Sequence, residues 1–110
     1  MHPLFYKLNT RDNVIFTKHC KERLLQRFKL FLLSFERENP EIYLKKDFKT
    51  SKVNMSDFLC PGYMNQIESK HGKNSFISRS NNLVYFCRFD EKTNQIIVKS
   101  IVKNNGNIYI

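Results

Sequence analysis

The feature that most limits what this chain can fold into is a stretch from residue 18 to residue 37 that contains no Gly or Pro. Its apolar residues recur at helical spacing, which predicts an amphipathic helix with one buried face. Thr17 precedes the stretch and is of a residue type that caps helix N-termini. We therefore expect one long helix from Lys18 to Phe35 or Arg37. Its buried face is formed by Cys20, Leu24, Phe28, Phe31, Leu32 and Phe35.

The last third of the chain has the pattern of β-strands, with β-branched and aromatic residues between turn residues. An α+β fold follows, in which an antiparallel sheet of three or four strands packs on the long N-terminal helix. At 110 residues the chain is expected to form a single domain, residues 1–110. The strands are expected at 76–79, 83–89 and 95–102, with a fourth at 14–16. In the last strand, alternation places Ile96, Val98, Ser100 and Val102 on one face.

The middle of the chain gives a weaker pattern. Asn39-Pro40 ends the first helix, and the basic segment up to Lys52 is expected to be a loop or a short helix. Residues 55–59 have the composition of a helical turn. Tyr63 to His71 predicts another short helix, because Gly72 suits the position after a helix C-terminus.

The formal net charge of +9, from 19 Lys and Arg against 10 Asp and Glu, predicts attraction to a polyanion. RNA is the partner we expect, and an acidic protein or an anionic membrane surface is the alternative. The sequence contains no apolar stretch long enough to span a bilayer, and its first residues lack the pattern of a signal peptide. We therefore expect a cytoplasmic protein with no membrane association.

Cys20, Cys60 and Cys87 are odd in number and far apart, and no C-x-x-C motif is present. This pattern argues against a disulfide framework and against a zinc knuckle. We expect three reduced thiols, no metal site and no cofactor.

One ridge of the predicted long helix carries an imidazole and two guanidinium groups. His19, Arg23 and Arg27 follow one another at i, i+4 and i+8, so each lies about 40° around the helix from the last. Metal-independent RNA cleavage requires a base for the 2′-hydroxyl proton and cations around the phosphate. These residues are candidates for those roles. The alternative is a solvated histidine beside two surface arginines.

Four further residues are candidates for substrate binding. His71 is a second imidazole that would serve as the complementary acid, or else be an ordinary surface residue. Arg79, Arg88 and Lys99 lie on predicted strands, where a cation that faces a groove contacts phosphate and one that faces solvent does not. The alternation of the strands leaves their direction open.

Aromatic residues follow one another along the second of the C-terminal strands. Tyr85, Phe86 and Phe89 are of the type that stacks on bases in sheet-based RNA-binding proteins. No aromatic RNP motif is present, and core packing is the role we expect for them.

Two segments resemble a group of compact ribonucleases. They are FTKHCKERLLQRF, with its H-x-x-x-R-x-x-Q-R pattern, and LVYFCRFDEKTNQIIVKSIV. Their order is similar to that in RelE-like toxins, the DUF4258 family and RegB-like phage endoribonucleases. The resemblance implies a RelE- or barnase-like architecture with His19 as the catalytic imidazole. It also implies phosphate-binding or structural roles for Arg23 and Arg27, and a functional hydroxyl at Ser100.

The leading hypothesis is therefore a small, basic, metal-independent endoribonuclease that leaves a 2′,3′-cyclic phosphate and a 5′-hydroxyl. One alternative is a non-catalytic module that binds nucleic acid or an acidic protein, such as a phage inhibitor of a host enzyme. Another is a toxin held by a cognate acidic antitoxin. Replacement of His19 separates the first hypothesis from the second, because only a nuclease loses cleavage without losing RNA affinity.

Overall fold

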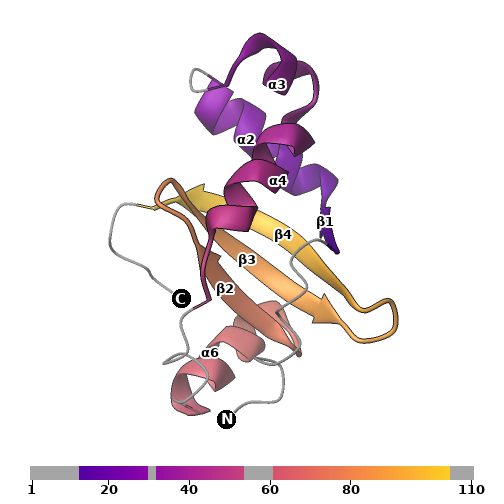
Figure 1. Cartoon of the computed structure of the whole chain (residues 1–110). Helices are drawn as coiled ribbons and strands as arrows, with labels where there is room; N and C mark the ends of the chain where they lie inside the picture. The colour runs from indigo at the N-terminus through magenta and orange to yellow at the C-terminus, as the bar shows by residue number, and fades with distance from the viewer. Residues whose placement is uncertain (1–12, 30–31, 54–60, 105–110) are drawn as a thin grey trace.

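The computed structural model describes residues 13–29, 32–53 and 61–104 (Figure 1). These residues form four helices and a four-stranded sheet, which confirms the predicted α+β class. In chain order the elements are β1 (Val14–Phe16), α2 (Lys18–Phe28), α3 (Ser34–Glu38), α4 (Pro40–Thr50), α6 (Pro61–His71), β2 (Ser75–Arg79), β3 (Leu83–Asp90) and β4 (Gln95–Lys103).

The strand order in the sheet is β1-β4-β3-β2. The pairs β2–β3 and β3–β4 are antiparallel, as predicted from the short turns between them. β1 pairs parallel to β4, with Phe16 opposite Val98, so the expectation of an antiparallel sheet is wrong at this strand. The helices between β1 and the C-terminal strands form a crossover, and a crossover is what a parallel pair requires.

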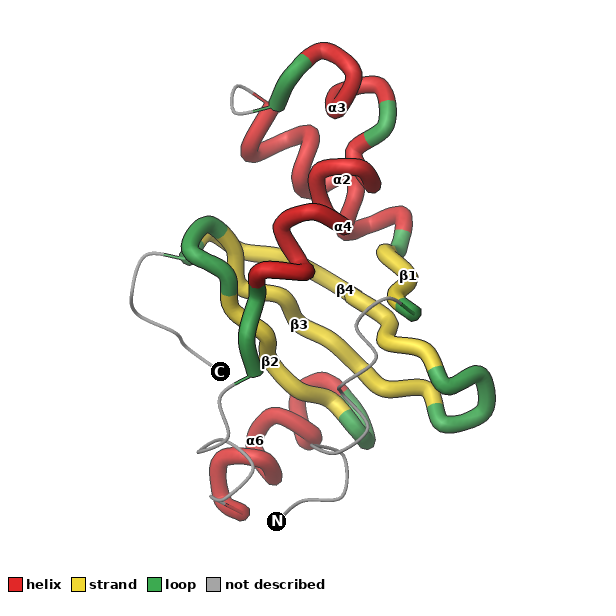
Figure 2. Tube along the Cα trace, in the orientation of Figure 1, coloured by secondary structure: helices red, strands yellow, loops and turns green. Residues whose placement is uncertain are grey.

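Helices cover both faces of the sheet (Figure 2). The Tyr85 ring packs edge-on against Phe48 of α4, and the ring of the next residue, Phe86, stacks on His71 of α6. Successive residues of a strand point to opposite faces, so α4 and α6 lie on opposite faces. We call these the Tyr85 face and the Phe86 face.

The core lies mainly on the Tyr85 face, where α2 and α4 pack on the sheet. Phe48 is at its centre, with ring centroids 6.0 Å from Phe16 and 5.1 Å from Tyr85. Cys20 and Leu24 are completely buried, which confirms the predicted inner face of α2. The same face of the sheet contributes Phe76, Cys87, Phe89, Ile96, Val98 and Ile101.

The predicted long helix is two helices, because α2 ends at Phe28. α2 follows β4 from Lys99, whose carbonyl accepts from Thr17, to Lys103, which lines a cavity with Phe28. Eleven helical residues span about 16 Å, as do the last five residues of β4. A helix that continued to residue 35 would therefore extend beyond the sheet.

A second helix start is encoded within the predicted long helix. Glu36 Oε1 accepts a hydrogen bond of 2.8 Å from the backbone N–H of Leu33, which caps α3. Leu33 and Phe35 are 61% and 53% exposed, so the apolar pattern that suggested continuation does not correspond to burial. Pro40 then occupies the first turn of α4, where it costs no helical hydrogen bond.

The other local predictions differ in outcome. The segment after Pro40 is the helix α4, and the helix at Tyr63 to His71 is confirmed as the main part of α6. Gly72 follows α6 with a φ of 101°, and its N–H donates to the Glu68 carbonyl. The predicted helical turn at 55–59 lies outside the described residues.

A β-bulge in β4 reverses the predicted face of its C-terminal half. Phe86 pairs with Ser100 and Cys87 pairs with Val98, so Lys99 is left without a partner on β3. The expectation that Ser100 shares a face with Val98 is therefore wrong. Ser100 lies on the Phe86 face, because one extra residue inverts the alternation.

A buried carboxylate joins α4 to the turn between β2 and β3. Asp47 accepts hydrogen bonds from the Ser80 hydroxyl at 2.6 Å, from the Asn82 side-chain amide and from the Tyr85 hydroxyl. Burial, followed by the nearby carboxylate, raises the pKa of Tyr85, so its hydroxyl stays protonated and donates. Three donors replace the water that the carboxylate loses, which gives Asp47 a structural role.

Cys20 and Cys87 are buried free thiols, as expected, and Cys60 lies outside the described residues. Burial raises the pKa of Cys20 to about 12, so this thiol is not a nucleophile at neutral pH. The described part of the chain contains no group of three or more His, Cys, Asp or Glu residues arranged to bind a metal ion. None of its helices is long and apolar enough to cross a membrane.

Candidate nucleic-acid interface

Most of the predicted substrate-binding residues gather on the Phe86 face. Phe86 and Arg88 alternate along β3 onto this face, and Ser100 is the register partner of Phe86 on β4. His71 reaches the same patch from the C-terminal end of α6. We call these four residues, together with Lys99, the sheet site. The side chains of Phe86, Arg88 and Ser100 are half-buried, whereas the strand residues behind them on the Tyr85 face are buried.

His71 is held by contacts from two strands. Its ring lies against the Phe86 ring, with centroids 5.2 Å apart and an angle of 29° between the planes. Its backbone carbonyl accepts a hydrogen bond of 3.0 Å from Lys99 Nζ. That carbonyl belongs to the last residue of α6, where the helix dipole favours a cation. The bulge residue Lys99 thus links β4 to the end of α6.

The surroundings of His71 favour its neutral form. Partial burial lowers the pKa of the imidazole below its ordinary value of 6.5, and the ammonium groups of Lys99 and Lys70 lower it further. A neutral imidazole at physiological pH is able to accept a proton. His71 therefore combines a fixed ring position with the protonation state of a general base.

Arg88 and Ser100 offer donors on the same face of the sheet as this imidazole. Among the described residues, neither side chain is engaged in a hydrogen bond or an ion pair. Arg88 has Ser75 and Ile97 as its register partners on the two neighbouring strands. An anion at the sheet site would therefore meet a guanidinium and a hydroxyl that need not break a protein contact first.

Arg79 lies on the same face but supports α6. Its Nη2 donates a hydrogen bond of 2.9 Å to the Tyr63 hydroxyl, and its backbone pairs with Lys52. This contact ties α6 to β2 at the edge of the sheet. Of the four predicted substrate-binding residues, His71 and Lys99 are in contact, Arg88 lies on the same face of the sheet, and Arg79 is engaged with α6.

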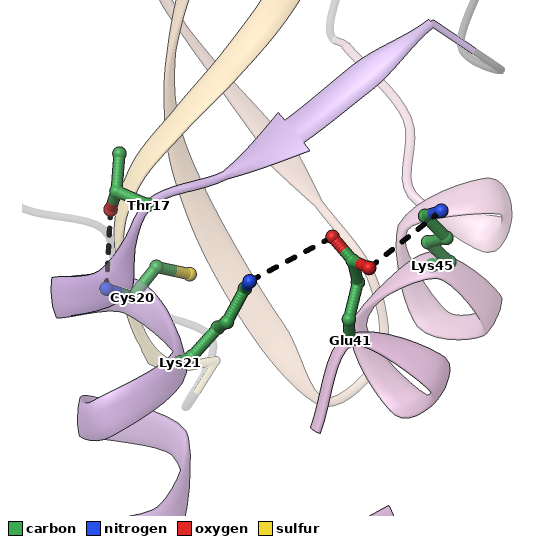
Figure 3. Close-up of polar contacts among 5 residues, drawn as sticks. All are labelled: Thr17, Cys20, Lys21, Glu41 and Lys45. Carbon is green, nitrogen blue, oxygen red and sulfur yellow. Dashed lines mark hydrogen bonds and ion pairs between the residues drawn. The ribbon is translucent and has the colours of Figure 1, made fainter. Parts of the chain in front are cut away.

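The ridge formed by His19, Arg23 and Arg27 lies on the other side of the sheet. The N-cap Thr17 accepts from the Cys20 N–H at 3.2 Å and so fixes the start of α2 (Figure 3). His19 and Arg27 are exposed, and Arg23 is half-buried. We call these three residues the α2 ridge.

The α2 ridge is turned away from α4. Lys21, on the opposite flank of the buried stripe, forms an ion pair of 3.9 Å with Glu41 of α4, as Figure 3 shows. The α2 ridge therefore runs along the side of β4, which pairs with β1 only up to Val98. His19 carries no carboxylate partner among the described residues.

The α2 ridge and Ser100 do not share a face. The buried side of α2 packs on the Tyr85 face, and the Ser100 side chain points to the Phe86 face. Their elements meet at the bulge, where the Thr17 hydroxyl donates to the Lys99 carbonyl at 3.1 Å. The eight predicted residues thus separate into the α2 ridge on one side of the sheet, the sheet-site residues on the other, and Arg79, which is bonded to α6 at the β2 edge.

The aromatic member of the sheet site was assigned to the core by the sequence. Tyr85 and Phe89 are core residues as expected, and Phe86 packs against the core while its ring also stacks on His71. The polar pair Lys99-Ser100 inside an apolar strand was the available signal for the bulge, and alternation alone concealed it.

No family model, no curated protein and no solved structure matches this chain.

Proposed function

We propose that this protein is a metal-independent endoribonuclease whose reaction centre is the sheet site. The observation that carries the proposal is the fixed, neutral imidazole of His71, which stacks on Phe86 and accepts through its carbonyl from Lys99, on a sheet face that also carries Arg88 and Ser100. The net charge of +9 supports a polyanionic substrate. The resemblance of two segments to RelE-like, DUF4258 and RegB-like proteins supports RNA, and cytoplasmic RNA in particular, as that substrate.

In this proposal His71 is the general base. It removes the proton from the ribose 2′-hydroxyl, and the 2′ oxygen forms a bond to the adjacent phosphorus. The bond between phosphorus and the 5′ oxygen breaks, and the departing oxygen takes a proton from water. The products are a 2′,3′-cyclic phosphate and a 5′-hydroxyl, and His71 later returns its proton to solvent.

The neighbouring donors stabilise the charge that develops during this step. Arg88 and Lys99 carry positive charge toward the phosphate, and Ser100 donates to one of its oxygens. Phe86 keeps the imidazole in position through ring contact, so it acts as a positioning residue. The α2 ridge then serves to bind the RNA backbone, and His19 remains the second candidate for the base.

The test is incubation of the full chain with total RNA in EDTA, followed by mapping of both ends of each fragment. Wild type is expected to cleave and to leave cyclic phosphates, and His71→Ala is expected to lose cleavage while it still binds RNA. Lys92→Gln, in the turn between β3 and β4, is the matched surface control. Cleavage by His71→Ala at the wild-type rate would contradict the proposed base.

A non-catalytic module that binds nucleic acid or an acidic protein is the second candidate. The exposed α2 ridge favours it, because cations without carboxylate partners attract a polyanion whether or not a reaction follows. An acidic antitoxin would cover the same cations. Binding of RNA without cleavage by any preparation of the wild type would select this candidate.

A further inference from the structure

A cavity of about 270 Å³ opens on the Tyr85 face, beside the turn between β2 and β3 and the C-terminal end of β4. Its volume lies just below the range of about 300 to 1,000 Å³ that is usual for drug-sized ligands, so it suits a smaller ring system. It is separate from the sheet site, since no residue is common to both. Its lining is formed by Leu24, Phe28, Tyr43, Asn81, Asn82, Leu83, Lys103 and Asn104.

Apolar and aromatic side chains form part of the lining of the cavity. Leu24 and Leu83 are buried, and the rings of Phe28 and Tyr43 are half-buried. Both rings belong to helices that are packed on the core, so their positions are set by the fold. A planar ligand gains stacking and burial against such rings at little cost in side-chain entropy.

Three side-chain amides also line the cavity, and that of Asn81 is available for a ligand. Asn82 donates to Asp47 Oδ1 at 3.2 Å, and Asn104 donates to the Ser80 carbonyl at 2.6 Å. The exposed side chain of Asn81 makes no hydrogen bond within the described residues. An asparagine side-chain amide has one hydrogen-bond acceptor and two donors. These complement the donors and acceptors along the edge of a nucleobase.

Among the described residues that line the cavity, one side chain is charged, and it is the exposed Lys103 of β4. A neighbouring cavity of about 490 Å³ shares Tyr43, Asn81 and Asn82 and is also lined by Glu36, Asp47 and Lys46. An anionic group is favoured beside Lys103, because the neighbouring cavity has two carboxylates against one ammonium. We therefore expect a bound ligand to place its anionic group at Lys103 rather than in the neighbouring cavity.

We propose that this cavity binds a nucleoside phosphate. The base lies against Phe28 and Tyr43, its edge is read by Asn81, and its phosphate lies at Lys103. The ligand is a free mononucleotide or one nucleotide of an RNA strand, since both present the same chemistry. The proposal does not depend on RNA cleavage or on His71.

The test is titration of the ¹⁵N-labelled full chain with ribonucleosides and with the corresponding 5′-monophosphates, followed by NMR. We expect shifts at Asn81, Asn82 and Asn104 and weaker effects at the sheet site. Asn81→Ala should weaken binding of nucleosides and of monophosphates alike. Lys103→Gln should raise the Kd of monophosphates about threefold and leave that of nucleosides unchanged. Lys92→Gln is the matched control, because Lys92 is an exposed lysine in the turn that precedes β4.

A short oligoribonucleotide distinguishes the two sources of the ligand. Saturable binding of the monophosphates identifies a mononucleotide site, and binding of the oligonucleotide alone, weakened by Asn81→Ala and Lys103→Gln, identifies a site for one nucleotide of a strand. The proposal is overturned if neither ligand shifts the cavity residues, or if the two variants bind like wild type. His71→Ala should bind as wild type does, so failure here is separate from failure of the proposed nuclease.

Discussion

The α2 ridge and the sheet site both offer a histidine and two cations, but their surroundings differ. His19 lies on the outer side of one helix, exposed, with its arginines on the same helix. His71 lies where α6, β3 and β4 meet, with its ring against Phe86 and its carbonyl bonded to Lys99. A histidine becomes a precise base when several elements fix its position.

The comparison also shows why spacing within one helix is an incomplete guide to chemistry. Residues at i, i+4 and i+8 always share a ridge, whatever that ridge faces. The sheet site is assembled from residues that are 28 positions apart in the case of His71 and Lys99. Its chemistry depends on the register of β3 and β4, which a helical pattern does not report.

Replacement of each histidine by alanine gives the largest expected effect. His71→Ala should lower the cleavage rate by about 100-fold to 10,000-fold, the usual contribution of a positioned general base. His19→Ala should lower it by less than about tenfold, through RNA binding. The measurement is single-turnover cleavage of a defined RNA by both single variants and the double variant. A larger loss for His19→Ala would assign the base to the α2 ridge.

Substitutions at the adjacent positions Tyr85 and Phe86 test how much the packing on each face of the sheet contributes to stability. Tyr85→Ala should lower the free energy of unfolding by about 3 to 5 kcal/mol, because it opens a cavity and removes a donor from Asp47. Phe86→Ala should cost less than about 2 kcal/mol, because its ring is only half-buried. Urea denaturation measures both values. Equal costs would mean that the Phe86 face is as tightly packed as the core.

Arginine substitutions distinguish a role in the cleavage step from a role in RNA binding. Arg88→Gln should reduce the single-turnover rate at saturating protein by about tenfold or more, because it removes charge stabilisation at the phosphate. Arg23→Gln and Arg27→Gln should instead weaken RNA binding about threefold each and reduce the salt slope by about one. Cleavage and filter binding at several salt concentrations give both quantities. A loss of rate without a loss of affinity in the ridge variants would contradict this division.

The smallest expected effect is a shift in the midpoint of the pH dependence of cleavage. The pKa of His71 is lowered from 6.5, so cleavage should rise with pH through a midpoint below 6.5. The unfolded chain binds this proton more readily than the folded chain, so His71 makes folding less favourable as the pH falls below 6.5. Lys99→Gln should move the midpoint upward, because it removes a nearby positive charge. A midpoint that does not respond to Lys99→Gln would separate this titration from His71.

Local elements were predicted well where one sequence pattern had one structural meaning. Val14–Phe16 before the cap Thr17, the helix before Gly72 and the two C-terminal turns all appear as expected. In each case the signal is a turn or cap residue whose conformational preference is local. The sequence after Pro40 is compatible with a loop or a helix, because the burial of this segment depends on contacts with the sheet.

The errors have tertiary causes. The long helix stops at Phe28, where β4 ends beneath it, and Glu36 provides a new start. The parallel partner of β4 follows from a crossover that no local pattern specifies. The bulge at Lys99 places Ser100 on the face that carries His71, whereas the sequence left open whether Ser100 and His19 are adjacent in space.

By itself the sequence determined the α+β class, the positive charge, the inner face of α2 and the residue types available for phosphate chemistry, because these depend on composition and local periodicity. The tertiary structure alone decided which histidine meets which cations. That choice depends on strand register, and a single unpaired residue in β4 turns every later side chain to the other face of the sheet.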